Sequence, residues 1–184
     1  LAGIDIVRKI IEETIAQHDQ EHIPVILSSQ PHRIVDRTAF LLGIEPQNPA
    51  YALLALIQEL AQAGASVVAI PCNTAHAPEI MDRVQAGLVQ AQTPVKLLHL
   101  VAETASFIAQ VYGAIPVGIL STTGTKNTGL YKQALEALGL EPIEPDEEEQ
   151  ARVPQTIYDQ HYGIKAQSSP VTNRARQELI AAIT

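Results

Sequence analysis

Short apolar runs alternate with helical patterns along most of this chain, and this alternation limits the folds that it can adopt. The apolar runs, each short enough to form a single strand, lie at residues 24–28, 66–71, 94–98, 115–121 and 140–143. Between them, apolar residues recur at the three- and four-residue spacing of an amphipathic helix, as at residues 4–18, 100–112 and 129–138. Strands that alternate with helices predict a parallel sheet flanked by helices, so we expect an α/β protein.

The same pattern occurs twice in the chain. A short apolar run, a turn of small polar residues and a helix follow one another at residues 66–88 and again at residues 115–138. We therefore expect two similar Rossmann-like lobes, the first formed by residues 1–98 and the second by residues 99–184. In such folds the loops at the carboxyl ends of the strands bind ligands, and we expect the site in the cleft between the lobes.

Further helices are marked by their ends. Pro49 begins a helix that Gly64 ends, and four acids at residues 146–149 begin another, which we expect Pro154 to end or kink. Residues 157–165 and 172–183 also have helical patterns. The chain begins almost at a helix and reaches Thr184 within a helical pattern. We therefore expect strands of the complete fold to lie before Leu1 and after Thr184.

Composition excludes several classes of function. The 184 residues carry a formal net charge of -8 without a basic cluster, which argues against nucleic-acid binding, and an anionic ligand would need a local cationic pocket. No apolar run approaches the ~20 residues of a membrane-spanning helix, and no secretory signal is present. One cysteine excludes an internal disulfide and fits a reducing, cytoplasmic setting.

That one cysteine, Cys72, follows the apolar run at residues 66–71 and precedes Asn73 and Thr74. We expect a helix from about Ala75, so the thiol would lie at a helix N-terminus, where its pKa falls and it forms a thiolate. The alternative is a buried cysteine that acts as a small apolar residue. Asn73 and Thr74 either cap the helix or hold an anion. His76 is a candidate thiol–imidazole partner, but one Cys and one His are too few to bind a metal.

A second polar turn follows the apolar run at residues 115–121. Thr122, Thr123 and Thr125 offer hydroxyl and backbone donors to an anion, or they simply begin the next helix. The turn lacks the lysine spacing of a P-loop. Spacing alone does not distinguish Arg37 and Lys165 from the other basic residues, which number 12 in all.

Taken together, these segments resemble the aspartate/glutamate racemase family, in particular its aspartate racemase-like branch. The matching segments are residues 36–38 (DRT), 71–76 (PCNTAH), 120–125 (LSTTGT) with Tyr131, and 162–165 (YGIK). The resemblance implies two Rossmann-like lobes with the site between them. It also implies racemisation without a cofactor, by two cysteines on opposite faces of the substrate's α-carbon.

The resemblance also implies roles for particular residues. Cys72 matches the first catalytic cysteine, and Arg37 and Lys165 match basic residues that hold substrate carboxylates. The matches to substrate contacts are Asn73, Thr74 and Thr122. The second cysteine belongs to a Gly-Cys-Thr motif that we expect beyond Thr184, so we do not expect these 184 residues alone to racemise.

The implied ligand is a small dicarboxylic amino acid, with aspartate ahead of glutamate, and the implied assembly is a homodimer without nucleic acid or membrane. Two alternatives stay open. One is a decarboxylase or cis–trans isomerase of small diacids that uses one cysteine on the same fold. The other is a dicarboxylate-binding protein without turnover.

Overall fold

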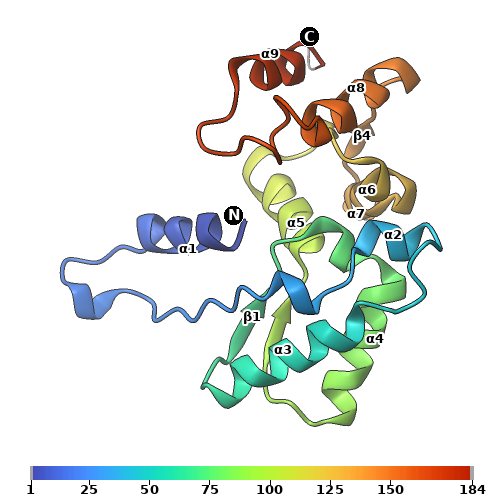
Figure 1. Ribbon diagram of the computed structural model, residues 1–184. Helices are drawn as coiled ribbons and strands as arrows, with labels where there is room; N and C mark the ends of the chain where they lie inside the picture. The colour runs from blue at the N-terminus through green and yellow to red at the C-terminus, as the bar shows by residue number, and fades with distance from the viewer. Residues whose placement is uncertain (1, 183–184) are drawn as a thin grey trace. The chain divides into compact units, whose positions relative to one another are not determined.

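The structure is a computed structural model that describes residues 2–182 (Figure 1). Its α-helices are α1 (Ala2–Glu13), α2 (Arg37–Leu41), α3 (Ala50–Gln62), α4 (Pro78–Gln90), α5 (Leu100–Tyr112), α6 (Thr123–Thr128), α7 (Leu130–Glu136), α8 (Glu147–Tyr158) and α9 (Asn173–Ala181). Its strands are β1 (Val67–Ala69), β2 (Lys96–Leu98), β3 (Pro116–Gly118) and β4 (Glu141–Ile143). Short 3-10 helices are formed by Asp19–Glu21, Pro31–Arg33 and Asn73–His76.

The predicted α/β class is confirmed. β1 pairs in parallel with β2, and β3 pairs in parallel with β4. Helix α4 connects the first pair of strands, and α6 and α7 connect the second, as parallel neighbours require a crossover. The chain divides into two compact units between Glu103 and Thr104, within α5. The limits 1–98 and 99–184 for two functional lobes stay a prediction.

The core of the first unit lies between its helices and the β1–β2 sheet. α3 and α4 pack against each other, and the middle residue of β1, Val68, is buried against them. The remaining buried residues of this core are Ala50, Leu53, Ile57, Ala75, Ile80, Met81, Val84 and Leu88. α4 and Ala75 before it are buried in this core, so the loop that carries Cys72 is held in place at both of its ends.

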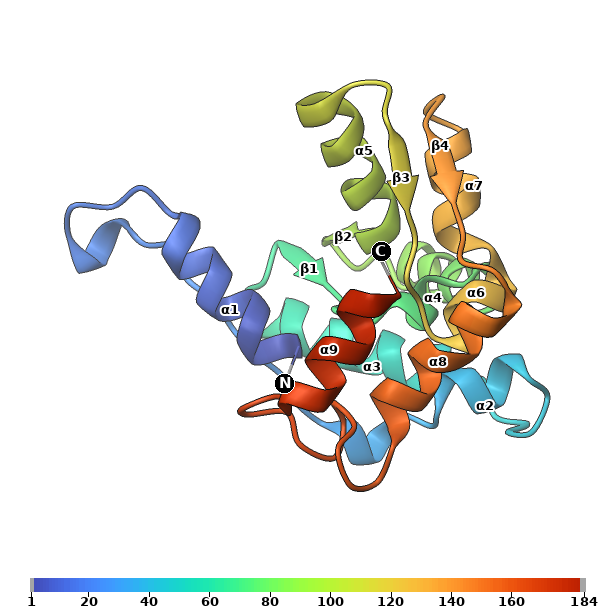
Figure 2. The same ribbon diagram turned by 90° about the horizontal axis from the view of Figure 1, so that it is seen from above.

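The second unit has a smaller aliphatic core around its own sheet. Ala105 of α5, Leu135 of α7 and Leu140 are buried together, with Val117 of β3 packed against them. Figure 2 shows α5 and α7 beside the β3–β4 pair. α8 and α9 pack against each other farther along the chain, where the buried Thr156 hydroxyl donates to Glu178 Oε2 at 2.8 Å. This contact joins the last two helices of the unit.

Several predicted elements differ from the structure near the first helix. α1 ends at Glu13 rather than at residue 18, and Ile15 beyond it is fully exposed, so no packing extends the helix. The expected strand at residues 24–28 is wrong. Val25, Ile26 and Leu27 are exposed, and no strand within residues 2–182 pairs with them to form a ladder.

The C-terminal predictions also need correction. α8 continues through Pro154, because Val153 and Thr156 on either side of it are buried and hold the helix in place. Residues 159–165 form tight turns instead of a helix. The last helix ends at Ala181, and the predicted end at Ile183 lies outside the described residues. Within residues 2–182, no helix has both the length and the apolar character needed to cross a bilayer.

Candidate functional site

Cys72 lies three residues beyond the end of β1, at the edge of the sheet where ligands bind in α/β folds. It occupies the N-cap position of the 3-10 helix Asn73–His76 without a side-chain capping hydrogen bond, and α4 begins only at Pro78. The expected α-helix starting at Ala75 is therefore wrong. A residue before proline is driven out of the helical region, and Ala77 accordingly adopts an extended backbone with φ -60° and ψ 139°. The thiol thus does not lie at the N-terminus of an α-helix.

The surroundings of the thiol nevertheless make it acidic. Partial burial raises the pKa of Cys72. A hydrogen bond with Thr74, the positive charge of Arg37 and a backbone hydrogen bond from Ala75 together lower this pKa by more than burial raises it. The net effect is a pKa below the ordinary value for a thiol. The Sγ atom lies 3.5 Å from Thr74 Oγ1, and the Thr74 side chain is only 8% exposed. Donors and a cation are thus arranged around a forming thiolate.

Arg37 reaches this site from the start of α2. Asp36 caps that helix by accepting a hydrogen bond from the Ala39 N–H at 2.8 Å. No ion pair within residues 2–182 occupies the Arg37 guanidinium, whereas nearby Arg33 pairs with Glu59 at 2.7 Å. Among the described residues, Arg33 is thus held in an ion pair and Arg37 is not, a difference that the spacing of basic residues in the sequence could not reveal. The charge of Arg37 is available to a ligand carboxylate.

His76 does not form the expected thiol–imidazole pair. Its side chain is 1% exposed, and its Nε2 lies 3.0 Å from the carbonyl oxygen of Ile70. The other nitrogen, Nδ1, has no hydrogen-bond partner within residues 2–182. The ring packs against His99, with 4.6 Å between centroids. Sequence reasoning missed His99, although it directly follows β2, and parallel pairing brings the ends of β1 and β2 to one edge.

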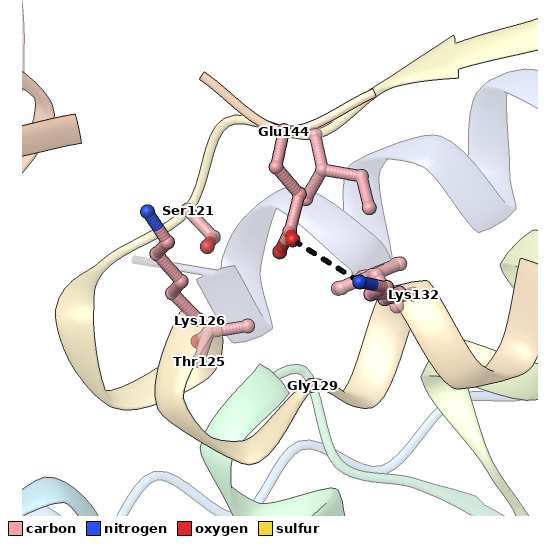
Figure 3. A pocket seen from close by; sticks show the side chains of 8 residues that line it. Ser121, Thr125, Lys126, Gly129, Lys132 and Glu144 are labelled. Atoms are coloured by element: carbon pink, nitrogen blue, oxygen red, sulfur yellow. Dashed lines mark ion pairs between the residues drawn. The ribbon is translucent and has the colours of Figure 1, made fainter. Parts of the chain in front are cut away.

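The second unit places Thr122 at the start of α6. Its hydroxyl lies 3.3 Å from that of Thr125, which is buried. A small cavity of about 10 Å³ lies beside this turn (Figure 3). In Figure 3, Glu144 reaches from the end of β4 toward Lys132, at 3.9 Å. The cavity has room for about one water molecule and not for an amino acid.

Lys165 follows a tight turn in the second unit. The Asp159 carboxylate accepts hydrogen bonds from the N–H groups of His161 and Tyr162, and the Lys165 N–H donates to the Ile157 carbonyl. The turn requires Gly163, because a Cβ there would lie 2.5 Å from the Asp159 carbonyl oxygen. The Lys165 ammonium lies 4.3 Å from the centroid of the Tyr158 ring and is exposed.

The structure thus brings Arg37, Cys72 and Thr74 together in the first unit. Asn73 begins the 3-10 helix with an exposed side chain, and Thr122 and Lys165 lie in the second unit. No group of His, Cys, Asp and Glu side chains in the described part of the chain could hold a metal ion. The chemistry visible in the first unit is that of an acidic thiol beside a guanidinium that makes no ion pair within residues 2–182.

Fold and thiol together define an α/β protein with a cysteine of lowered pKa after a parallel strand. Its structure is similar to an aspartate racemase from Picrophilus torridus, with a TM-score of 0.76 and 25% identity over 99% of this chain and 69% of the other. A protein from Yersinia pestis, proposed to be an Asp/Glu racemase, matches with a TM-score of 0.72 and 25% identity over 99% of this chain and 74% of that one.

A third similar structure, an aspartate racemase homologue from Pyrococcus horikoshii, supports the fold alone, at 22% identity and a TM-score of 0.62 over 86% of this chain and 64% of that one. The sequence model of the Asp/Glu/hydantoin racemases matches residues 1–184. The chain belongs to the Asp/Glu/hydantoin racemase family, and it is therefore an isomerase of the racemase class.

Proposed function

We propose that this chain forms the Cys72 half of a racemase that acts on a small dicarboxylic amino acid, with aspartate as the favoured substrate and glutamate as the second, and that Cys72 transfers the α-proton. The observation that carries the proposal is an acidic thiol beside the guanidinium of Arg37, which makes no ion pair within residues 2–182 and donates only to the Val35 carbonyl at 3.4 Å besides the thiol. Family membership and the two aspartate/glutamate racemase neighbours support the same reaction.

The proposed first step is removal of the α-proton by the Cys72 thiolate. An S–H bond forms as the C–H bond breaks, and the electron pair moves into the substrate carboxylate to give an enediolate. Because an amino-acid α-proton is a very weak acid, the growing negative charge needs a preorganised cation, and we assign this role to Arg37. Return of a proton to the opposite face, by the second thiol that the resemblance implies, completes the inversion.

The remaining roles are part of the same proposal. Lys165 binds the second carboxylate, and Asn73, Thr74 and Thr122 hold the substrate through hydrogen bonds. The exposed ammonium of Lys165 has no ion pair within residues 2–182, which supports its assignment to an anion. Thr74 also supports the thiolate, because its hydroxyl lies 3.5 Å from the sulfur. The proposed homodimer rests on the resemblance, and light scattering of the purified protein measures it. The proposed cytoplasmic location rests on the single cysteine, which fits a reducing compartment.

The test follows exchange of the α-proton in D2O. L-aspartate and D-aspartate are incubated separately with the full-length protein, and proton NMR follows loss of the α-proton signal while chiral chromatography follows the opposite isomer. We expect the Cys72→Ser variant to lose exchange from the enantiomer whose proton Cys72 removes, because a hydroxyl ionises far less readily than a thiol. Arg152→Met, on the exposed surface of α8, is the matched control and keeps wild-type exchange. Retained α-proton signal in both enantiomers with wild-type protein would exclude the racemase.

A second candidate uses the same acidic thiol of Cys72 without a second cysteine. An enzyme with one thiol would decarboxylate or isomerise a small diacid, with Cys72 as proton donor or nucleophile. The same NMR samples, prepared with malonate-type diacids and with maleate, separate the candidates. Release of carbon dioxide or conversion of the cis double bond, without exchange in aspartate, would select this second function.

A further inference from the structure

The carbonyl oxygen of Ile70 receives two hydrogen bonds at the turn that carries the thiol. The Cys72 N–H donates to it at 2.8 Å, and the Nε2 atom of His76 lies 3.0 Å from it. Pro71, between them, has no N–H and a fixed φ. The Ile70 carbonyl therefore links the main chain at Cys72 to the buried imidazole of His76.

The geometry defines the protonation of His76. A carbonyl oxygen can only accept, so Nε2 must carry the proton, and Nδ1 then holds a lone pair. A second proton on Nδ1 would create a buried charge and an unpaired N–H, because Nδ1 has no partner within residues 2–182. Burial lowers the pKa of His76, the Ile70 hydrogen bond partly opposes this, and the nearby His99 lowers it further. The ring is thus a neutral donor and not a base.

His99 keeps that ring in place from the neighbouring strand. Its own ring packs against His76 at an interplanar angle of 57°, and its Nδ1 accepts a hydrogen bond from the Ala102 N–H at 3.3 Å. The contact joins the residues after β1 to those after β2, both within the first unit. His76 therefore packs against His99, and its one N–H points at the Ile70 carbonyl.

We propose that His76 is a positioning residue, whose Nε2–H holds the Ile70 carbonyl and thereby holds the Cys72 thiol against Thr74 and Arg37. This inference rests on the proposed use of Cys72 as the proton-transferring group. The alternative, a histidine that only fills the core, predicts that any side chain of similar size would serve equally well. The positioning role requires an N–H donor at this position, and the core-filling role does not.

The experiment compares His76→Gln with His76→Met. The two side chains have the same length, but only the glutamine amide can place an N–H where Nε2 lies. The readout is the pH dependence of Cys72 alkylation by iodoacetamide, followed by peptide mass spectrometry. This measures the thiol whether or not the protein turns over aspartate. kcat and KM for racemisation and the thermal unfolding midpoint are measured beside it.

We expect His76→Gln to keep the wild-type alkylation midpoint and a kcat within about threefold. In His76→Met the midpoint should move up toward the ordinary thiol value of about 8.5, and kcat should fall by about tenfold or more with little change in KM. Equal behaviour of the two variants, whether both like wild type or both equally impaired, would overturn the proposal. If His76→Met does not fold, His76→Leu, which also lacks an N–H donor, replaces it in the same comparison with His76→Gln.

The two proposals fail in different ways. Absence of α-proton exchange in the wild-type protein rejects the racemase while leaving the alkylation result for His76 intact. A normal exchange rate with equal alkylation midpoints in the two variants rejects the role of His76 and leaves the racemase standing.

Discussion

The acidity of the Cys72 thiol depends on side chains that reach it from different parts of the first unit. Thr74 lies two residues away, while Arg37 comes from the start of a separate helix, α2. Both lower the pKa of the thiol against the effect of burial. Two residue-scale predictions follow from the different natures of these groups, a charge in one case and a hydroxyl in the other.

Removing the charge of Arg37 should raise the thiol pKa and weaken substrate binding. Arg37→Met keeps the length of the side chain but loses the cation. Charge-assisted hydrogen bonds contribute about 1.5–3 kcal/mol, so kcat/KM for aspartate should fall by about 10- to 150-fold. Arg37→Lys, which keeps the charge without the bidentate geometry, should recover the pKa better than it recovers kcat/KM. An unchanged alkylation profile in Arg37→Met would contradict the electrostatic role.

Removing the hydroxyl of Thr74 should have a smaller effect in the same direction. Thr74→Val preserves the shape of this buried side chain and removes the hydrogen bond to sulfur. A neutral hydrogen bond is worth about 0.5–1.5 kcal/mol, so kcat should fall by about 2- to 12-fold as the thiol pKa rises. Thr74→Ser, the control, keeps the hydroxyl and should retain the wild-type alkylation profile.

At this scale the sequence could predict the residues of one continuous segment but not their partners. Cys72 and Thr74 could be identified from the sequence, because both follow an apolar run in a recognisable order. The contact between His76 and His99 depends on the register of β1 against β2, in which Ala69 pairs with Leu98. No local pattern encodes that register, so His99 could not be identified.

Elements with clear end signals were predicted well, and elements that depend on partners were not. α5 has the predicted bounds Leu100–Tyr112, because Gly113 adopts a φ of 72° and ends the helix. Residues 24–28 have the composition of a strand but no strand to pair with within the described chain. Pro78 moved the start of α4 away from Cys72, an effect that the helical periodicity of the segment obscures.

The turn before Lys165 provides a prediction about an element. Gly163→Ala places a Cβ 2.5 Å from the carbonyl oxygen and 2.7 Å from the nitrogen of Asp159, so the backbone must move. We expect a loss of about 1–3 kcal/mol in the free energy of unfolding, as for other overpacked sites, measured by urea denaturation. Gly118→Ala is the matched control, because nothing lies within 4 Å of its added Cβ. Equal stabilities of the two variants would show that the turn is not constrained at Gly163.

For the whole molecule, alternation of strand and helix patterns was enough to predict the α/β class, because parallel pairing requires crossovers. What the alternation could not supply is the network of charges on the folded surface. Carboxyl groups have lowered pKa values where they accept hydrogen bonds, as in Glu59 from Arg33 and in Glu178 from Arg174 and Thr156. Depressed carboxyl pKa values stabilise the native state above the unfolded-state pKa, and this stabilisation disappears as the pH falls through the native value.

We therefore predict that the chain loses stability in acid below about pH 4.5, the ordinary glutamate value, and that Glu178 contributes to this loss. Glu178→Gln keeps an acceptor for the Thr156 hydroxyl but cannot titrate. Its urea midpoint should be lower than that of wild type at pH 7 and should approach it at pH 3, which flattens the pH profile. Glu79→Gln, an exposed site outside the ion pairs of residues 2–182, is the control. Parallel profiles for wild type and Glu178→Gln would contradict the prediction.

The short 3-10 turn at Cys72 has an evolutionary consequence. Had the thiol lain at the N-terminus of a long α-helix, the helix dipole would have contributed a fixed part of its ionisation. Here the side chains at positions 37 and 74 lower the thiol pKa together with one backbone hydrogen bond from Ala75, over an anchored main chain. Descendants of this scaffold could therefore shift their working pH by single substitutions while every strand and helix stays where it is.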